Sequence, residues 1–279
     1  MMAIFDGHVH LSDEKPEEYV EALLRAMDRN GVGRAIVFGV QGDPEAPDSL
    51  ASSAHKRWPD RFTPFTCELD TEHPQMAEWL DERLSEGDWR GLGEIFVTTN
   101  DPVMTYQTSD GETGEFRYPV PANGPLDPHF GEVFEVCAKH GIPALVHCDD
   151  EEVMETLVSR HPATTIIWGH ADWYINSVRR LLGGYPNLIC DIGTGLHFAA
   201  LDHAEKNLVE DWLAVWVPLL EEFAGRISFG SDLFEWRHLE PDENADCAYS
   251  LLERVTSQLS AEAKEAWLWG TLQKALGEY

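Results

Sequence analysis

Residues 142–148 (IPALVHC) and 164–170 (TTIIWGH) are short apolar runs that each carry a histidine at or next to their carboxyl end. Runs of this length are typical of strands buried in a parallel sheet. Six further runs have the same character, and they span residues 3–10, 34–40, 61–69, 90–97, 187–193 and 226–232. We therefore predict eight strands.

Helix-like segments alternate with these strands. One of them places four apolar side chains on a single face and is expected to end at His140 and Gly141, because glycine favours helix termination. Its apolar residues are Phe130, Val133, Phe134 and Cys137, and two later segments with helical period contain Leu208, Trp212, Val215, Trp216, Leu219 and Phe223, and Leu268, Leu272, Ala275 and Leu276. No break in composition divides the chain. The pattern predicts an α/β fold, a single (β/α)8 TIM barrel over residues 1–279.

One connection is longer than the others. Residues 98–126 (TTNDPVMTYQTSDGETGEFRYPVPANGPL) follow the fourth predicted strand without clear periodicity. Long segments of this kind are often functional lids. Because the segment leaves the carboxyl end of a strand, we expect a lid-like loop over the face of the barrel that carries active sites.

Charge and composition limit the classes of partner. The chain has 50 acidic and 20 basic residues, a formal net charge of −30. Such a surface repels nucleic acid and anionic membranes, and it is typical of proteins adapted to a salty cytoplasm, where ions screen the repulsion. No apolar run approaches the ~18 residues of a membrane span, and no signal peptide is recognisable. We expect a cytoplasmic protein with a small-molecule substrate, and a homodimer is the default expectation for assembly.

Polar residues of metal-binding type occur at the ends of the predicted strands. His8 and His10 in MMAIFDGHVHL lie two residues apart, so both imidazoles point to the same face of a strand. Four further candidates lie at or near the ends of other predicted strands, namely Glu94, His147, His170 and Asp232. Imidazoles and carboxylates gathered at one mouth are suited to a divalent ion. Zn2+ is the first choice, Mn2+ and Fe2+ are possible, and one or two ions are compatible with this set.

The motifs HVH, GLGEIF, LVHC, WGHAD and FGSDLF, in this order, resemble those of the amidohydrolase superfamily, in particular its amidohydrolase-2 branch. The resemblance covers nearly the whole chain. It departs from the branch in WLWGTLQKAL, where Thr271 stands in place of a common asparagine. The resemblance implies a metal-dependent enzyme, a hydrolase or a decarboxylase, although some superfamily members work without metal.

The resemblance also implies roles for individual residues. In a mononuclear scheme, the ligands are His8, His10, His147 and Asp232, and His170 is free to exchange protons. In a binuclear scheme, His147 and His170 bind the second ion and Glu94 bridges the pair, as in TatD-like hydrolases. Alternatively, Glu94 orients a ligand without touching metal.

Asp232 is the expected general base and His170 the alternative proton carrier, in the hydrolysis of an amide, ester or lactone. Six residues of the loops are candidates for binding a small, carboxylate-bearing substrate, and they are Arg117, Trp173, Tyr174, His197, Trp236 and Arg237. Three alternatives stay open: a decarboxylase of an unsaturated or aromatic acid, a TatD-like nuclease, which the charge of −30 disfavours, and a non-catalytic metal-binding barrel.

Overall fold

Eight parallel strands form the centre of the protein in a computed structural model that describes residues 3–11, 15–42, 47–100, 103–107, 113–196, 208–234, 239 and 247–278. The strands are β1 (Ile4–His10), β2 (Val32–Phe38), β3 (Phe62–Thr66), β4 (Gly91–Thr98), β7 (Ala144–Cys148), β8 (Ile166–Trp168), β9 (Leu188–Ile192) and β10 (Ile227–Phe229). They are hydrogen-bonded in this order. All eight predicted strands are confirmed, with shifted ends.

The barrel closes between β1 and the segment that follows β10. The backbone N–H of His10 donates to the carbonyl of Leu233 at 2.8 Å, and the N–H of Asp232 donates to the carbonyl of His8 at 2.9 Å. Asp6 reinforces the seam, because its carboxylate accepts from the N–H of Ser231 at 2.9 Å. This closure makes the eight strands a TIM barrel and brings Asp232 beside the histidines of β1.

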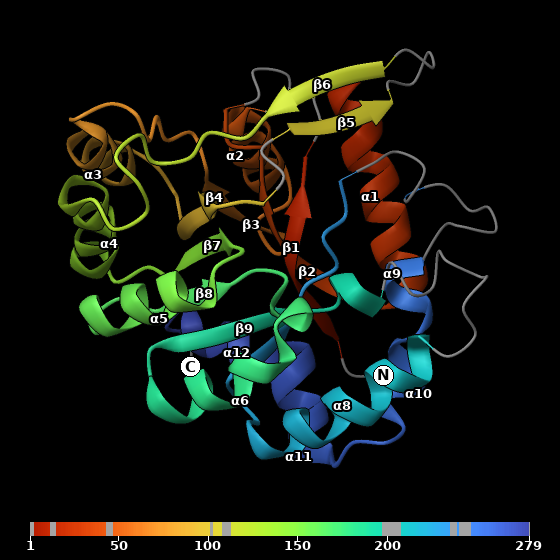
Figure 1. Ribbon diagram of the computed structural model, residues 1–279. Coiled ribbons are helices and arrows are strands. Elements are labelled where there is room, and N and C mark those ends of the chain that lie inside the picture. Colours follow the sequence, from red (N-terminus) through yellow and green to blue (C-terminus); the bar gives the residue numbers. More distant parts are fainter. Residues whose placement is uncertain are drawn as a thin grey trace.

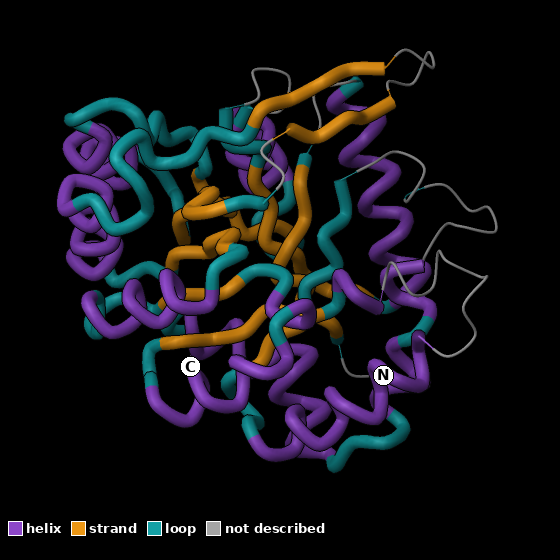
Figure 2. The backbone as a smooth tube through the Cα atoms, viewed as in Figure 1, coloured by secondary structure: helices purple, strands orange, loops and turns teal. Residues whose placement is uncertain are grey.

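Helices surround the strands (Figures 1 and 2). They are α1 (Pro16–Asn30), α2 (Asp48–Arg57), α3 (Met76–Glu86), α4 (Pro128–His140), α5 (Glu151–Arg160), η1 (Ala171–Trp173), α6 (Ile175–Gly184), α8 (Leu208–Glu222), α9 (Cys247–Ser250), α10 (Leu252–Thr256), α11 (Ala261–Glu265), a π-helical turn η3 (Ala266–Gly270) and α12 (Thr271–Ala275). The helix α4 ends at Gly141 as predicted, where the backbone is left-handed with a φ of 65°. Among the helices described, none combines the length and apolarity that a membrane crossing requires.

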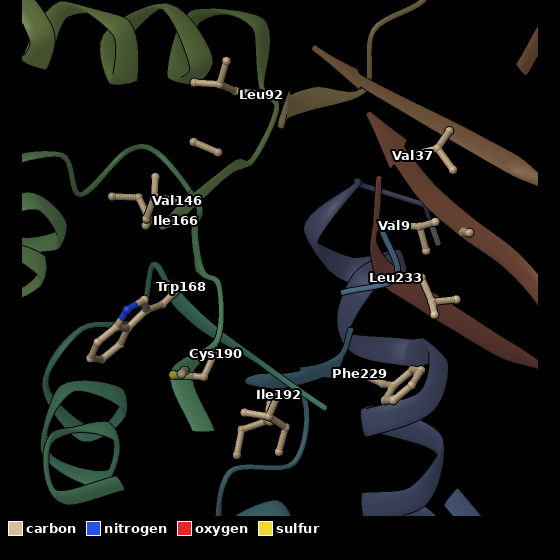
Figure 3. Packing of buried hydrophobic residues seen from close by; sticks show 14 of the residues in the cluster. Val9, Val37, Leu92, Val146, Ile166, Trp168, Cys190, Ile192, Phe229 and Leu233 are labelled. Atoms are coloured by element: carbon tan, nitrogen blue, oxygen red, sulfur yellow. The ribbon is translucent and has the colours of Figure 1, made fainter. Parts of the chain in front are cut away.

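The outer core lies between the strands and the helices. Figure 3 shows part of it, with labelled apolar side chains that come from successive strands, among them Val9, Val146 and Phe229. These residues are fully buried. Their alternation with inward-facing residues along each strand leaves one set of side chains for the interior of the barrel.

A second core fills the interior of the barrel. It consists of Phe5, Ile36, Phe38, Phe65, Cys67, Leu145, Ile167, Ile189, Leu272 and Leu276. The last two come from the C-terminal segment, which covers the amino-terminal end of the strands. Trp269 packs 5.4 Å from the ring of Phe5, and Arg34 binds both carboxylate oxygens of Glu278 at 2.5 and 2.9 Å. With this end filled, polar side chains can gather only at the opposite, carboxyl-terminal mouth.

The long connection after β4 contains regular structure, which the sequence analysis did not predict. Strands β5 (Val103–Gln107) and β6 (Thr113–Arg117) form an antiparallel hairpin at the end of the barrel toward which β1 points (Figure 1). The hairpin is separate from the eight-stranded sheet, so its strands need no continuous apolar run, which explains the lack of a strand pattern in this stretch of sequence. The lid-like role of the connection stays a prediction. The ring of Tyr118, directly after β6, stacks on the ring of Phe96, and the two ring centroids are 3.9 Å apart.

We predict that Leu272→Ala lowers the free energy of unfolding by about 2–5 kcal/mol, because it leaves a cavity in the interior core. Denaturant titration measures this change. The control is Val215→Ala: Val215 was predicted on the buried face of α8, but 39% of it is exposed. This control should stay within about 0.5 kcal/mol of wild type. Equal effects of the two substitutions would contradict the assignment of Leu272 to the core.

Candidate metal centre

The six predicted ligand residues converge at the carboxyl-terminal mouth of the barrel. His8 and His10 belong to β1, Glu94 to β4 and His147 to β7, whereas His170 and Asp232 directly follow β8 and β10. Their ligand atoms form three overlapping sets in which all atoms lie within 4.8 Å of one another, and the sets are His8, His10 and Glu94; His8, His170 and Asp232; and Glu94, His147 and His170. Glu94 belongs to two of these sets and is 3% exposed. The predicted convergence of all six side chains is therefore observed.

We call four of these atoms the first group: His8 Nε2, His10 Nε2, Glu94 Oε2 and Asp232 Oδ1. Their distances suit an ion site. Glu94 Oε2 lies 3.6 Å from His8 Nε2 and 3.3 Å from His10 Nε2. Asp232 Oδ1 lies 3.5 Å from each of the same two nitrogens. Ligand atoms around an ion with metal–ligand bonds of about 2.1 Å lie about 3.4 Å apart in a tetrahedron, so these four nitrogen–oxygen distances are compatible with a divalent ion. The Nε2 atom of His8 is moreover buried and has no hydrogen-bond partner among the described residues.

Hydrogen bonds on the far side of each ring orient the two histidines. His10 Nδ1 donates to the carbonyl oxygen of Gly39 at 2.8 Å, and His8 Nδ1 donates to Asp191 Oδ2 at 2.9 Å. A carbonyl or an ionised carboxylate can only accept, so the proton of the neutral ring is on Nδ1. The lone pair of each Nε2 is then available to an ion in the first group.

The second group consists of Glu94 Oε1, His147 Nδ1 and His170 Nε2, and hydrogen bonds join its atoms. Glu94 Oε1 accepts from His147 Nδ1 at 3.1 Å and from His170 Nε2 at 2.8 Å. The other nitrogen of His170 lies 3.0 Å from Thr194 Oγ1, and that of His147 lies 3.2 Å from Asp149 Oδ1. These contacts hold protons in the ion-free protein, whereas the nitrogen–oxygen distances of the first group, 3.3–3.6 Å, are longer than those of good hydrogen bonds. The two oxygens of Glu94 thus face two differently organised groups.

Two residues of the site have a strained backbone. Among the residues that the structure describes, only Lys15, His170 and Asp232 combine a side chain with positive φ, at 57°, 56° and 55°. This left-handed conformation is unfavourable for residues other than glycine and is often retained at functional sites. Gly230 helps Asp232 to reach its position, because the Asp191 carboxylate occupies the space of any side chain there, 2.1 Å from an added Cβ.

Burial and charge oppose each other in this centre. Burial alone would raise the pKa of Asp232, but His170, His10 and His8 outweigh it and lower that pKa to about 2. Glu94 is likewise held well below its usual pKa by His8 and His170, despite burial. Burial disfavours the charged imidazoles, yet the carboxylates raise the pKa of His10 and of His147 to about 9. In the ion-free protein the site is a network of imidazolium and carboxylate groups, and a bound ion displaces its protons.

The residues predicted to bind substrate are only partly described. Trp173 is 56% exposed in η1, and Arg117 is exposed on β6. The hydroxyl of Tyr174 donates to Asp149 at 2.6 Å, and its ring stacks on Trp168 at 5.0 Å. Three others, His197, Trp236 and Arg237, lie outside the described residues. The substrate-binding roles of all six remain predictions.

Sequence reasoning missed the groups that orient the histidines. They are Asp191 for His8, the carbonyl of Gly39 for His10, Asp149 for His147 and Thr194 for His170. Asp149 follows His147 by two residues, which is a usable signal. The other three belong to strands other than those of their histidines or to the segments that follow these strands, and only the closed barrel brings them together.

Residues 5–277 match the model of the Amidohydro_2 family of amidohydrolases. The chain belongs to this family. No curated protein matches this amidohydrolase in sequence.

Solved structures share its fold at low sequence identity. An amidohydrolase from Burkholderia multivorans with bound zinc is 19% identical, with a TM-score of 0.68 and coverage of 99% of each chain. A dihydroxybenzoic acid decarboxylase from Polaromonas sp. JS666 with bound manganese and an inhibitor is 15% identical, with a TM-score of 0.58 and coverage of 99% of this chain and 97% of that one. The 4-oxalomesaconate hydratase from Rhodopseudomonas palustris is 12% identical, with a TM-score of 0.59 and coverage of 99% and 96%.

We predict that the ion-free amidohydrolase loses stability as the pH rises from 6.5 through 9. The folded protein holds protons on His10 and His147 up to about pH 9, whereas the usual pKa of histidine is 6.5. Because the folded state binds more protons in this window, the free energy of unfolding falls as the pH increases.

Urea unfolding of chelator-treated protein at several pH values measures this slope. His147→Gln should reduce the slope, whereas His129→Gln, at an exposed position of α4, should preserve it. A stability that is flat or rising over this range would contradict the prediction.

Proposed function

We propose that this amidohydrolase is a metal-dependent hydrolase that cleaves an amide, ester or lactone bond of a small, carboxylate-bearing substrate. The observation that carries the proposal is the first group of ligand atoms. In it, the Nε2 atoms of His8 and His10 each lie 3.3–3.6 Å from an oxygen of Glu94 and from an oxygen of Asp232, distances that suit an ion and exceed good hydrogen-bond lengths. Mixed nitrogen and oxygen ligands favour Zn2+, with Mn2+ and Fe2+ as the next candidates.

A divalent ion held by the first group would lower the pKa of a water molecule and polarise a substrate carbonyl. Asp232 is placed to accept the proton of the attacking water and to return it to the leaving nitrogen or oxygen. Its low pKa keeps it ionised before the proton arrives. Asp232 Oδ2 lies 3.7 Å from His170 Nδ1, so His170 is the alternative carrier of this proton.

The proposed class of substrate rests on the loop residues that the sequence predicts to bind it. Trp173 and Arg117 are exposed, and Trp236 and Arg237, which lie outside the described residues, follow β10 in the sequence. Aromatic rings and a guanidinium group suit a small, partly apolar molecule with a carboxylate. With the many acidic residues of this chain, such a cation would also shield the substrate from repulsion.

A decarboxylase of an unsaturated or aromatic acid is the second candidate. The proton between His170 Nε2 and Glu94 Oε1, which are 2.8 Å apart, favours it. Decarboxylation breaks a carbon–carbon bond, releases CO2 and leaves a carbon that must take up a proton. His170 could supply that proton. The fold likeness to a dihydroxybenzoic acid decarboxylase is compatible with this alternative.

We predict that protein purified without chelator contains one or two divalent ions per chain by elemental analysis, and that the double variant His8→Ala, His10→Ala loses them. The substitutions remove two of the four atoms of the first group. His129→Ala serves as the control and should retain the wild-type content. An absence of metal from wild-type protein would overturn the proposal.

We predict that Asp232→Asn retains the ion but lowers kcat by about 10²–10⁴-fold, because the amide no longer accepts a proton. Asparagine tolerates the left-handed backbone, so the fold should persist. The assay uses a panel of carboxylate-bearing esters, lactones and amides, with CO2 release followed in parallel. Near-normal turnover with metal retained would show that Asp232 is not the general base. CO2 release without hydrolysis would favour the decarboxylase.

A further inference from the structure

Asp149 joins three elements at the rim of the metal centre. Its Oδ1 accepts from the hydroxyl of Tyr174 at 2.6 Å and lies 3.2 Å from His147 Nε2. Its Oδ2 accepts from the backbone N–H of Asn100 at 2.8 Å, and its own N–H donates to Thr98 Oγ1 at 3.0 Å. The carboxylate is thereby fixed between the end of β4, the end of β7 and Tyr174, the residue between η1 and α6.

This arrangement determines which way the ring of His147 faces. With Nε2 toward Asp149, Nδ1 is directed to Glu94 Oε1 at 3.1 Å. The ring of Phe96 lies 4.6 Å from the imidazole and is itself covered by Tyr118. A flip of His147 would exchange its two nitrogens and would leave Nδ1 away from the second group.

We propose that Asp149 is a positioning residue for His147: its contact with Nε2 turns Nδ1 toward Glu94 Oε1, as the binuclear scheme implied by the family resemblance requires of Glu94, His147 and His170. This inference rests on the proposed function, because it presupposes that the first group holds an ion. With a second ion at Nδ1, Asp149 would accept the remaining proton of His147 on Nε2. Carboxylates in this position typically strengthen metal binding by about 10–100-fold.

The effect of Asp149 should be selective for the second site. The two histidines of the first group are oriented by other partners, Asp191 and the carbonyl of Gly39. His170 is oriented by Thr194. Removal of the Asp149 carboxylate therefore disturbs one ligand of the second ion and none of the first. A residue that only stabilised the fold would instead change the unfolding midpoint without changing the number of ions bound.

The test compares wild type with Asp149→Asn, which is nearly isosteric, and with Asp150→Asn as the matched control. Asp150 loses the same charge one residue away, but it is exposed and caps α5 by accepting from the N–H groups of Glu152 and Val153. Ion-free proteins are titrated with Mn2+ by calorimetry, and the bound ions are examined by electron paramagnetic resonance. Two Mn2+ ions bridged by Glu94 give an exchange-coupled spectrum, whereas one ion gives an isolated six-line signal.

We expect wild type and Asp150→Asn to bind two Mn2+ ions with affinities that agree within about twofold. In Asp149→Asn, the second ion should bind about 10–100-fold more weakly, the first should be unaffected, and the coupled spectrum should give way to the isolated one. Tight binding of two ions by Asp149→Asn would overturn the inference. Wild type that binds only one ion would also overturn it, but would leave the proposed function intact, whereas wild type that binds none would overturn the proposed function itself.

A measurement on wild-type protein tests the same inference even if the Asp149→Asn variant does not fold. Nitrogen NMR of the histidine rings in protein with one and two equivalents of Zn2+ reports the position of each proton. The second equivalent should remove the proton from His147 Nδ1 and leave that on Nε2. The opposite result would contradict the role of Asp149.

Discussion

The carboxylate of Glu94 is the constraint on which the rest of the site depends. It is buried inside a barrel, and each of its oxygens faces two histidines, His8 and His10 on one side and His147 and His170 on the other. A buried charge without such partners would cost several kcal/mol. The four imidazoles therefore stabilise the ionised carboxylate, and they come from β1, from β7 and from the segment directly after β8.

The surrounding chain holds these groups apart at the spacing that an ion needs. In the first group, bonds from His8 to Asp191 and from His10 to the carbonyl of Gly39 direct both Nε2 atoms inward. Asp232 is kept opposite them by the seam of the barrel and by a left-handed backbone. Such a cluster contributes little stability, so the apolar interior and the C-terminal segment around Leu272 must supply it.

The same geometry is compatible with hydrolysis and with decarboxylation, because the two reactions differ in what the substrate presents rather than in the ligands that an ion would have. A shared set of histidines and carboxylates can serve a water molecule or a substrate carboxylate. Fold likeness at 12–19% identity does not choose between them.

The sequence by itself determined the eight strands, their alternation with helices and the six residues at the carboxyl ends, because apolar runs and strand-end polar residues are local patterns. It did not show the hairpin of β5 and β6, whose strands pair with each other and carry no such run, nor the exposure of Val215. Only the tertiary structure decided that Glu94 divides its oxygens between two groups, one open and one hydrogen-bonded. It also brought Asp191 and Thr194 to His8 and His170, 183 and 24 residues away. These pairings depend on barrel closure and strand order, which place distant residues within ångströms of one another and are not encoded in any local spacing.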